Sequence, residues 1–172
     1  MELKEIILRR RSIRKFKAQE VSLDILNEIT KYSLLAPSGR NSKPVELVII
    51  TDKNKIREIK KAREGAFSFL ESAPACIVVT ADEASSTWLS DASIVAAYIQ
   101  LLCVDYGLGS CWGHAFERYQ DGISVEESIK SLLSIPINYR VLCVIGVGYP
   151  DEIKDGHSLE EVNTAKLHHE KW

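Results

Sequence analysis

The chain has 172 residues, of which 45% are hydrophobic and 27% charged, and its formal net charge at pH 7 is −2. This length is typical of one domain that buries a substantial core, and we expect residues 1–172 to form a single domain. No apolar run approaches the length needed to cross a bilayer, and acidic residues near the amino end argue against a secretion signal. We therefore expect a cytoplasmic protein without a membrane partner.

Apolar spacing in the first part of the chain predicts helices and strands in alternation. It predicts a short amphipathic helix over about residues 2–9. Ser22 is a typical N-cap for a second helix, which Pro37 stops. A run of β-branched residues at 45–51 predicts a buried strand, and a charged helix over about 53–63 follows it.

The rest of the chain continues this alternation. The predicted elements are a short helical piece at 66–70, a strand at 75–80, a long helix at 90–106 capped by Gly107, a helix at 124–133 with a capping box, and a strand at 140–147. Strands separated by helices favour an α/β layered fold. The strands are almost continuously apolar, which indicates that both faces of the sheet are covered.

The cysteines and histidines do not indicate a metal site. Their spacing matches neither a zinc motif nor a redox pair, and we predict no metal. We expect buried free thiols at Cys76, Cys103 and Cys143, whereas Cys111 lies in a glycine-rich turn. A thiolate nucleophile at Cys111 assisted by His114 is disfavoured because no third residue is available to orient the pair.

The stretch 9–17 carries six cationic side chains in nine residues. Such a local excess on a mildly acidic chain favours one anionic partner, and the planar arginine fork suits phosphate oxygens. Ile13 and Phe16 are interleaved with the cations and can anchor the segment to a core. We therefore favour a fixed phosphate site over the alternative, a flexible basic arm that binds nucleic acid.

Two further segments carry groups that suit a polar, planar ligand. Residues 36–44 form a proline-bounded bend in which Gly39 permits close approach, and Asn41 offers both a donor and an acceptor. Residues 107–113 include three glycines, whose backbone amides can converge on one acceptor. Each segment alone is also compatible with an ordinary loop. Because no acid pair or nucleophilic triad stands out, we expect the chemistry to belong to a cofactor.

Four segments occur in an order typical of one family: 10–14, 37–44, 107–113 and 148–150. Together they resemble the FMN-dependent nitroreductase family. The resemblance implies an α+β, three-layer fold with a central, mainly antiparallel sheet flanked by helices. It also implies an intertwined homodimer that binds FMN in two clefts at the interface.

The resemblance also assigns residues to FMN. Arg10, Arg11 and Ser12 would hold the phosphate and the ribityl chain. Arg14 would lie near the N1 and O2 side of the flavin. The flavin ring would be reached from the partner chain by Pro37, Ser38, Gly39, Asn41 and Lys43. The remaining assigned residues are Cys111, Trp112 and Gly113 on the N5 side, and Lys154 at the phosphate. No side chain is assigned a catalytic role, since the chemistry takes place on flavin N5.

Three departures from the family pattern are visible. Lys43 stands where the family commonly has glutamine, and it is predicted to raise the flavin midpoint potential. In the tail, Lys154 occupies the place of a phosphate-binding lysine, but Gly156 stands where the family commonly has an arginine. The chain is also short for the family, and the segment 115–123 is the candidate for a lid over the substrate pocket.

The implied activity is an oxidoreductase that transfers hydride from NADH or NADPH through FMN to a small acceptor, such as a nitroaromatic or a quinone, in a ping-pong cycle. One alternative is a non-catalytic flavin-binding or storage protein. Another is a flavin-fragmenting or dehalogenating enzyme on the same scaffold. Apart from a second copy of the chain and a small-molecule acceptor, no partner is expected, and nucleic acid is not.

Overall fold

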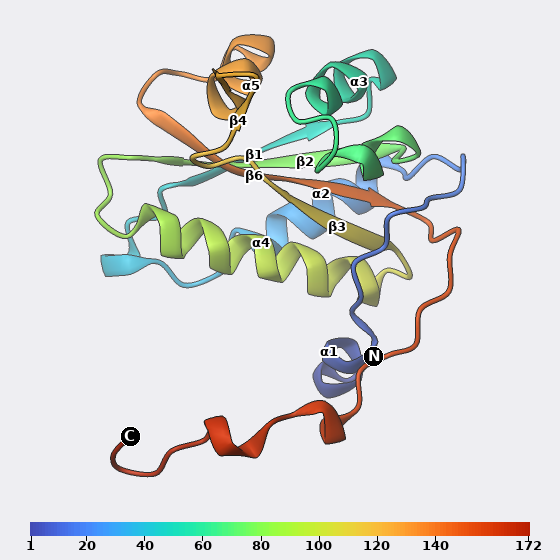
Figure 1. The fold of residues 1–172 in the computed structure, drawn as a ribbon, viewed down its shortest axis with the longest axis vertical. Coiled ribbons are helices and arrows are strands. Elements are labelled where there is room, and N and C mark those ends of the chain that lie inside the picture. Colours follow the sequence, from blue (N-terminus) through green and yellow to red (C-terminus); the bar gives the residue numbers. More distant parts are fainter.

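The computed structural model describes residues 1–172 as a β-sheet between two layers of helices (Figure 1). The four strands lie in the order β1 (Val45–Ile50), β2 (Ala75–Asp82), β6 (Tyr139–Gly148) and β3 (Gly109–His114). Every neighbouring pair of strands is antiparallel. The implied α+β fold with a mainly antiparallel central sheet is therefore confirmed.

Two long helices cover each face of the sheet. One face carries α2 (Leu23–Ser33) and α4 (Trp88–Asp105), and the other carries α3 (Lys53–Lys61) and α5 (Val125–Leu133). Because alternate residues of a strand point to opposite faces, Val79 of β2 enters the core beneath α2 and α4, whereas Val78 enters the core beneath α3 and α5. This double covering explains why the strands are apolar throughout.

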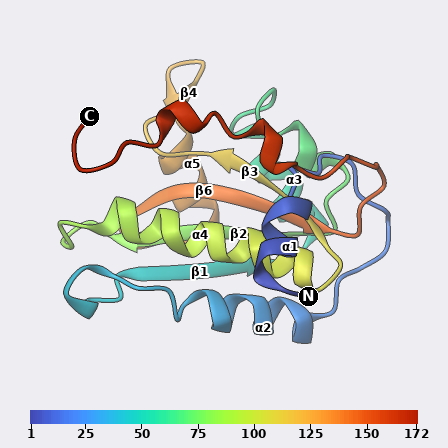
Figure 2. The same ribbon diagram turned by 90° about the horizontal axis from the view of Figure 1, so that it is seen from below.

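The two ends of the chain leave the body of the molecule together (Figures 1 and 2). The amino end forms α1 (Leu3–Arg9), and the tail contains two 3₁₀ turns at Leu159–Glu161 and Thr164–Lys166. The tail touches α1 where the amide of His157 donates to the carbonyl of Leu8 at 2.7 Å. Large apolar side chains such as Ile153 and Trp172 are fully exposed on this arm.

The segment 107–113 is mostly strand, and its prediction as a turn was wrong. After Gly107, which ends α4 with φ of 70°, the chain enters β3 at Gly109. The glycines reflect close packing within that strand. A Cβ atom at Gly109 would come within 2.7 Å of Ile13, and one at Gly113 within 2.7 Å of Phe67.

A second feature that the sequence did not predict is a small hairpin of β4 (Tyr119–Gln120) and β5 (Ile123–Ser124). This hairpin overlaps the candidate lid at 115–123.

The longest helix, α4, meets the length and apolar composition of a membrane-spanning helix, contrary to the expectation that no segment would. One of its faces lies in the core, where Ala92, Val95 and Ile99 pack against the sheet. A helix in the core of a globular protein can have the same length and apolar composition, so this helix alone is weak evidence for a membrane span. Leu89 and Tyr98 on this helix are exposed apolar side chains, and their spacing of nine residues places them on opposite flanks of the buried face.

Candidate functional site

The cationic amino-terminal segment is ordered along the open edge of β3. Ser12 forms a parallel bridge with Ser110, and the amide of Ile13 donates to the Ser110 carbonyl at 2.9 Å. The side chains of Ile13 and Phe16 are buried in the core beneath α3 and α5. The predicted anchoring of this segment by its two apolar residues is therefore confirmed, and a flexible arm is not what the structure shows.

The tail forms a strap over this segment. The Nζ atom of Lys154 donates to the Ser12 carbonyl at 2.6 Å and lies 3.4 Å from a carboxylate oxygen of Glu152. Glu152 in turn accepts hydrogen bonds from the backbone amides of Arg14 and Lys15. These amides, that of Arg14 foremost, hold the pKa of the Glu152 carboxyl below its usual value. Lys154 thus joins the cationic cluster that the sequence predicted.

The three arginines assigned to FMN keep most of their hydrogen-bonding capacity. Arg10 donates to the Gln100 side chain at 3.5 Å, and Arg11 donates to the carbonyl of Asp155. Arg14 donates to the carbonyl of Ser12, two residues earlier, at 3.3 Å. A guanidinium group has five N–H donors in a planar fork, and each of these side chains uses one. The cluster therefore has free donors that suit an anionic, multidentate ligand such as a phosphate.

Backbone amides of β3 face the open edge beside this cluster. The Ser110 and His114 carbonyls face away from β6, since Ile13 and Arg63 donate to them. Backbone groups of alternate strand residues point the same way, so the amide of Trp112 also faces the open edge. Gly113 has the opposite parity, and its amide points towards β6. The register thus makes Trp112, and not Gly113, the residue with an amide available to a ligand.

The side chains of this strand serve packing. The indole of Trp112 packs against the core and stacks on the imidazole of His114, with the ring centroids 6.2 Å apart. Cys111 points to the opposite face and is buried, and burial raises its pKa while the charges of Arg14 and Lys154 oppose that rise. A protonated, buried thiol gives no support to a nucleophilic role for Cys111.

The second predicted group, the bend at 37–44, is held by a buried acid. One oxygen of Asp91 on α4 accepts from the Gly39 amide at 3.0 Å, and the other accepts from the Thr87 hydroxyl at 2.8 Å. A Cβ atom at Gly39 would lie 2.3 Å from the Thr87 hydroxyl oxygen, so only glycine fits here. The Ser38 hydroxyl accepts from the Lys43 amide at 3.0 Å and closes the bend.

Three non-glycine residues in this bend have left-handed backbones, which is not typical of an ordinary loop. The φ angles are 54° for Arg40, 56° for Asn41 and 48° for Lys43. Such conformations cost free energy and cluster at functional sites. The three side chains are exposed, and a hollow of about 650 Å³ lies between the bend and residues 82–87. Pro37 precedes this strained turn and is also exposed.

The two groups lie at opposite ends of the sheet (Figures 1 and 2). The cationic segment joins the end where Ala75 pairs with Val147, and the bend joins the end where Asp82 pairs with Tyr139. Seven residue steps of β2 separate these ends, which is roughly 23 Å. One chain therefore brings Arg10, Arg11, Ser12, Arg14, Trp112 and Lys154 together, and it leaves Ser38, Gly39, Asn41 and Lys43 far from them.

Three residues that the sequence analysis missed hold these groups in place: Asp91, Gln100 and Glu152. Asp91 and Gln100 stand on the same helix and contact the bend and Arg10, respectively. A signal for Asp91 was present, because it is the only charged residue between Trp88 and Val104. Gly156, which replaces the arginine common in the family, lies against α1, and a Cβ atom there would be 3.0 Å from the Leu8 carbonyl oxygen.

Comparison with known proteins decides the family. A model described as the nitroreductase family matches residues 7–67 and 60–149. The chain belongs to the nitroreductase family.

Its relatives match over nearly the whole chain. A protein of Archaeoglobus fulgidus named "Putative NADH dehydrogenase/NAD(P)H nitroreductase" is 33% identical, with 99% of each chain covered. The structure of an FMN-dependent nitroreductase from Clostridium difficile R20291 has a TM-score of 0.93 and 39% sequence identity, and the match covers 97% of this chain and 98% of that chain. An iodotyrosine deiodinase of Thermotoga neapolitana is 23% identical over 93% of this chain and 95% of its own. The predicted family and fold are confirmed, and the names agree with the predicted class of flavin- and NAD(P)H-dependent oxidoreductases.

Proposed function

We propose that residues 1–172 form one flavin-binding domain of a homodimeric, FMN-dependent oxidoreductase. FMN, when bound, would supply the chemistry by taking hydride from NADH or NADPH at N5 and passing it to a small acceptor, such as a nitroaromatic or a quinone, in alternate half-reactions. One observation carries the proposal: in a chain of this family, guanidinium groups, the Lys154 ammonium and the Trp112 amide converge at one edge of the sheet.

The chemistry of these donors fits FMN. Arg10 and Arg11 offer unused N–H groups to a phosphate, and the Ser12 hydroxyl lies in the same segment. Arg14 and Lys154 add positive charge next to this edge, which would stabilise negative charge on the reduced ring. The Trp112 amide is a fixed donor for a ring heteroatom. These residues would bind and orient the flavin ring and stabilise its negative charge.

The separation of the two groups supports a dimer. Gly39 and Asn41 lie at the far end of the sheet, so a site that contains both groups needs the bend of a second chain. The exposed apolar residues of α4 and of the tail, among them Tyr98 and Ile153, would be covered in such an assembly. In this arrangement Lys43 comes to the ring from the partner subunit.

A spectrum of the purified protein tests the cofactor. We expect a yellow protein whose flavin absorption bleaches when NADH or NADPH is added without oxygen and returns when a quinone or a nitroaromatic is added. A colourless protein that does not bind added FMN would contradict the proposal. Bound flavin that neither nicotinamide reduces would favour the non-catalytic, storage alternative.

Co-expression of two damaged chains tests the shared site. In a heterodimer of an Arg10→Ala chain and an Asn41→Ala chain, one site carries both substitutions and the other carries neither. With random pairing, about a quarter of all sites would be intact, and activity should return to that level relative to the wild type. If both residues acted in the same chain, the mixture would be no more active than the single variants.

Dehalogenation is the second candidate, because an iodotyrosine deiodinase matches 93% of this chain. The two activities are separated by their products. Release of iodide from 3-iodotyrosine by the reduced protein would support the second candidate, and oxidation of the reduced protein by quinone or nitroaromatic alone would support the first. The segment 115–123 stays the predicted lid for either acceptor.

A further inference from the structure

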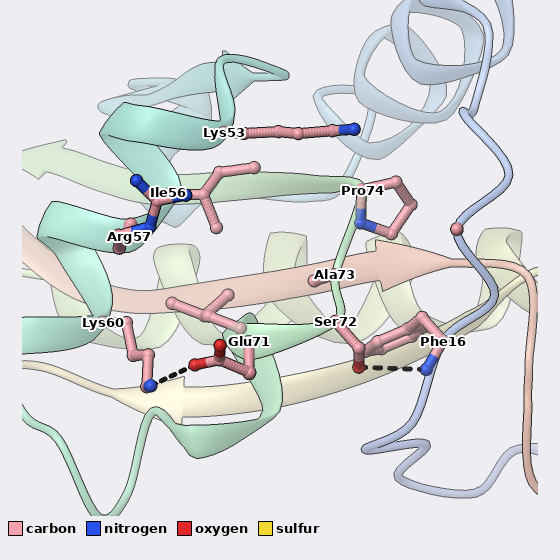
Figure 3. A pocket seen from close by; sticks show the side chains of 11 residues that line it. Phe16, Lys53, Ile56, Arg57, Lys60, Glu71, Ser72, Ala73 and Pro74 are labelled. Carbon is pink, nitrogen blue, oxygen red and sulfur yellow. Dashed lines mark hydrogen bonds and ion pairs between the residues drawn. The ribbon is translucent and has the colours of Figure 1, made fainter.

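A separate cavity of about 270 Å³ lies on the α3 side of the sheet (Figure 3). Its inner surface is formed by side chains of the core, since Phe16, Ile56 and Leu70 are each at most 4% exposed. Ala73 and Pro74 continue this apolar wall along the approach to β2. None of the residues assigned to FMN lines the cavity.

The mouth of this cavity is cationic. Lys53, Arg57 and Lys60 line it and follow one another at spacings of four and three residues, which places them on one side of α3. Lys60 pairs with Glu71. Lys53 has no ion pair, and Arg57 donates only to the Asn54 side chain at 3.2 Å.

Glu71, which also lines the cavity, is the one acidic group at this mouth, and three cations face it, so an excess of two positive charges stands over the apolar wall. Figure 3 shows the Lys53 side chain extending across the mouth towards Pro74. A hydroxyl group is also present, because Ser72 accepts from the Phe16 amide at 3.1 Å and keeps its own O–H free to donate. A bare inorganic anion would gain nothing from the apolar wall, and a neutral apolar ligand would gain nothing from the cations.

We propose that this cavity binds a small aromatic anion, an aryl carboxylate or sulfonate. Its ring would lie against Phe16, Leu70 and Pro74, and its charged group would lie between Lys53 and Arg57. The volume of about 270 Å³ is at the lower end for small-molecule sites, which suits a ligand of one or two rings.

Calorimetric titration of the FMN-supplemented protein with 2-naphthalenesulfonate tests this site. We expect saturable binding of one molecule per chain, weakened by added salt because the charges are partly exposed. The double variant Lys53→Gln/Arg57→Gln should lower the affinity at least about fivefold. The matched control, Lys55→Gln/Lys61→Gln, removes the same charge from the same helix outside the cavity and should leave the affinity unchanged.

A second variant tests the apolar wall. Ala73→Leu adds bulk inside the cavity and should reduce binding without changing any charge. Three results would overturn the proposal: no measurable binding to the wild type, equal affinities of the two double variants, or a change in the flavin absorption band on titration. The last result would place the probe on the flavin and not in this cavity. If Ala73→Leu does not fold, the comparison of the charge variants still decides.

Discussion

The backbone amide of Gly39 lies 3.0 Å from a carboxylate oxygen of Asp91, a residue that is 3% exposed and stands on an otherwise apolar helix. The second oxygen of Asp91 accepts from Thr87, so that one buried carboxylate ties the bend at Gly39 to the start of α4. The same helix contacts Arg10 through Gln100, nine residues further along. α4 thereby sets the spacing between the two groups that the proposed dimer would unite.

We expect Asp91→Ala to weaken the bend. It leaves the Gly39 amide without its acceptor and should lower the free energy of unfolding by about 1.5–3 kcal/mol. Asp91→Asn should recover part of this loss, because the Thr87 hydroxyl can rotate to accept from the new amide group. Urea denaturation measures the stability, and FMN titration below the unfolding transition measures the site. Asp105→Ala, at the other end of α4, is the control: it removes only an exposed ion pair with the amino terminus, so it should lower the stability much less than Asp91→Ala and leave FMN binding unchanged.

Arg10→Ala should weaken FMN binding by about 1.5–3 kcal/mol, because a charge-assisted contact to the phosphate is lost. The dissociation constant can be measured by the quenching of flavin fluorescence. Arg9→Ala removes an equal charge one residue earlier, where the side chain only pairs with Glu5 on the surface of α1. An Arg10→Ala protein that binds FMN as tightly as the Arg9→Ala protein would remove Arg10 from the site.

The sequence predicted well those features that depend on neighbouring residues. The interleaving of Ile13 and Phe16 with cations predicted an ordered segment, and the N-cap at Ser22 marks the start of α2. Contacts between distant residues were not predictable in this way. Gly39 and Asp91 are 52 residues apart, and Arg14 and Glu152 are 138 apart, so no local spacing connects them.

The error at 107–113 has a related physical cause. Glycines in a sequence indicate backbone freedom, but at Gly109 and Gly113 the missing side chain makes room for Ile13 and Phe67. Only the three-dimensional packing shows which of the two reasons applies. Likewise, the sequence could not show that the Trp112 amide faces the open edge, because this depends on the register between β3 and β6.

Lys43→Gln should make the midpoint potential of bound FMN more negative, because the proposed site brings this ammonium to the flavin from the partner subunit. A charge about 5 Å away in a water-like environment contributes on the order of 1 kcal/mol, or roughly 20 mV for a two-electron couple. Spectroelectrochemical titration measures this shift. Lys61→Gln, on the far side of α3, is the control, and an equal potential in both variants would exclude Lys43 from the ring.

The strap formed by the tail should weaken in acid. Hydrogen bonds from the Arg14 and Lys15 amides, together with Lys154, lower the pKa of Glu152 in the folded chain from its usual value of 4.5. A carboxyl group whose pKa is lower in the folded state stabilises that state above its unfolded pKa, and the contribution disappears as the pH falls through the folded value. The stability that Glu152 contributes should therefore be complete at pH 7, begin to fall near pH 4.5 and vanish in stronger acid.

Glu152→Gln isolates this contribution. The variant keeps the shape of the side chain but cannot carry the charge, so it should be less stable than the wild type at pH 7 and equally stable once Glu152 is protonated. Chemical denaturation at a series of pH values measures this difference. Glu160→Gln, which alters an exposed tail acid that has no ion pair, is the matched control for the change of charge. A stability gap between wild type and Glu152→Gln that does not change with pH would show that the strap does not depend on the carboxylate charge.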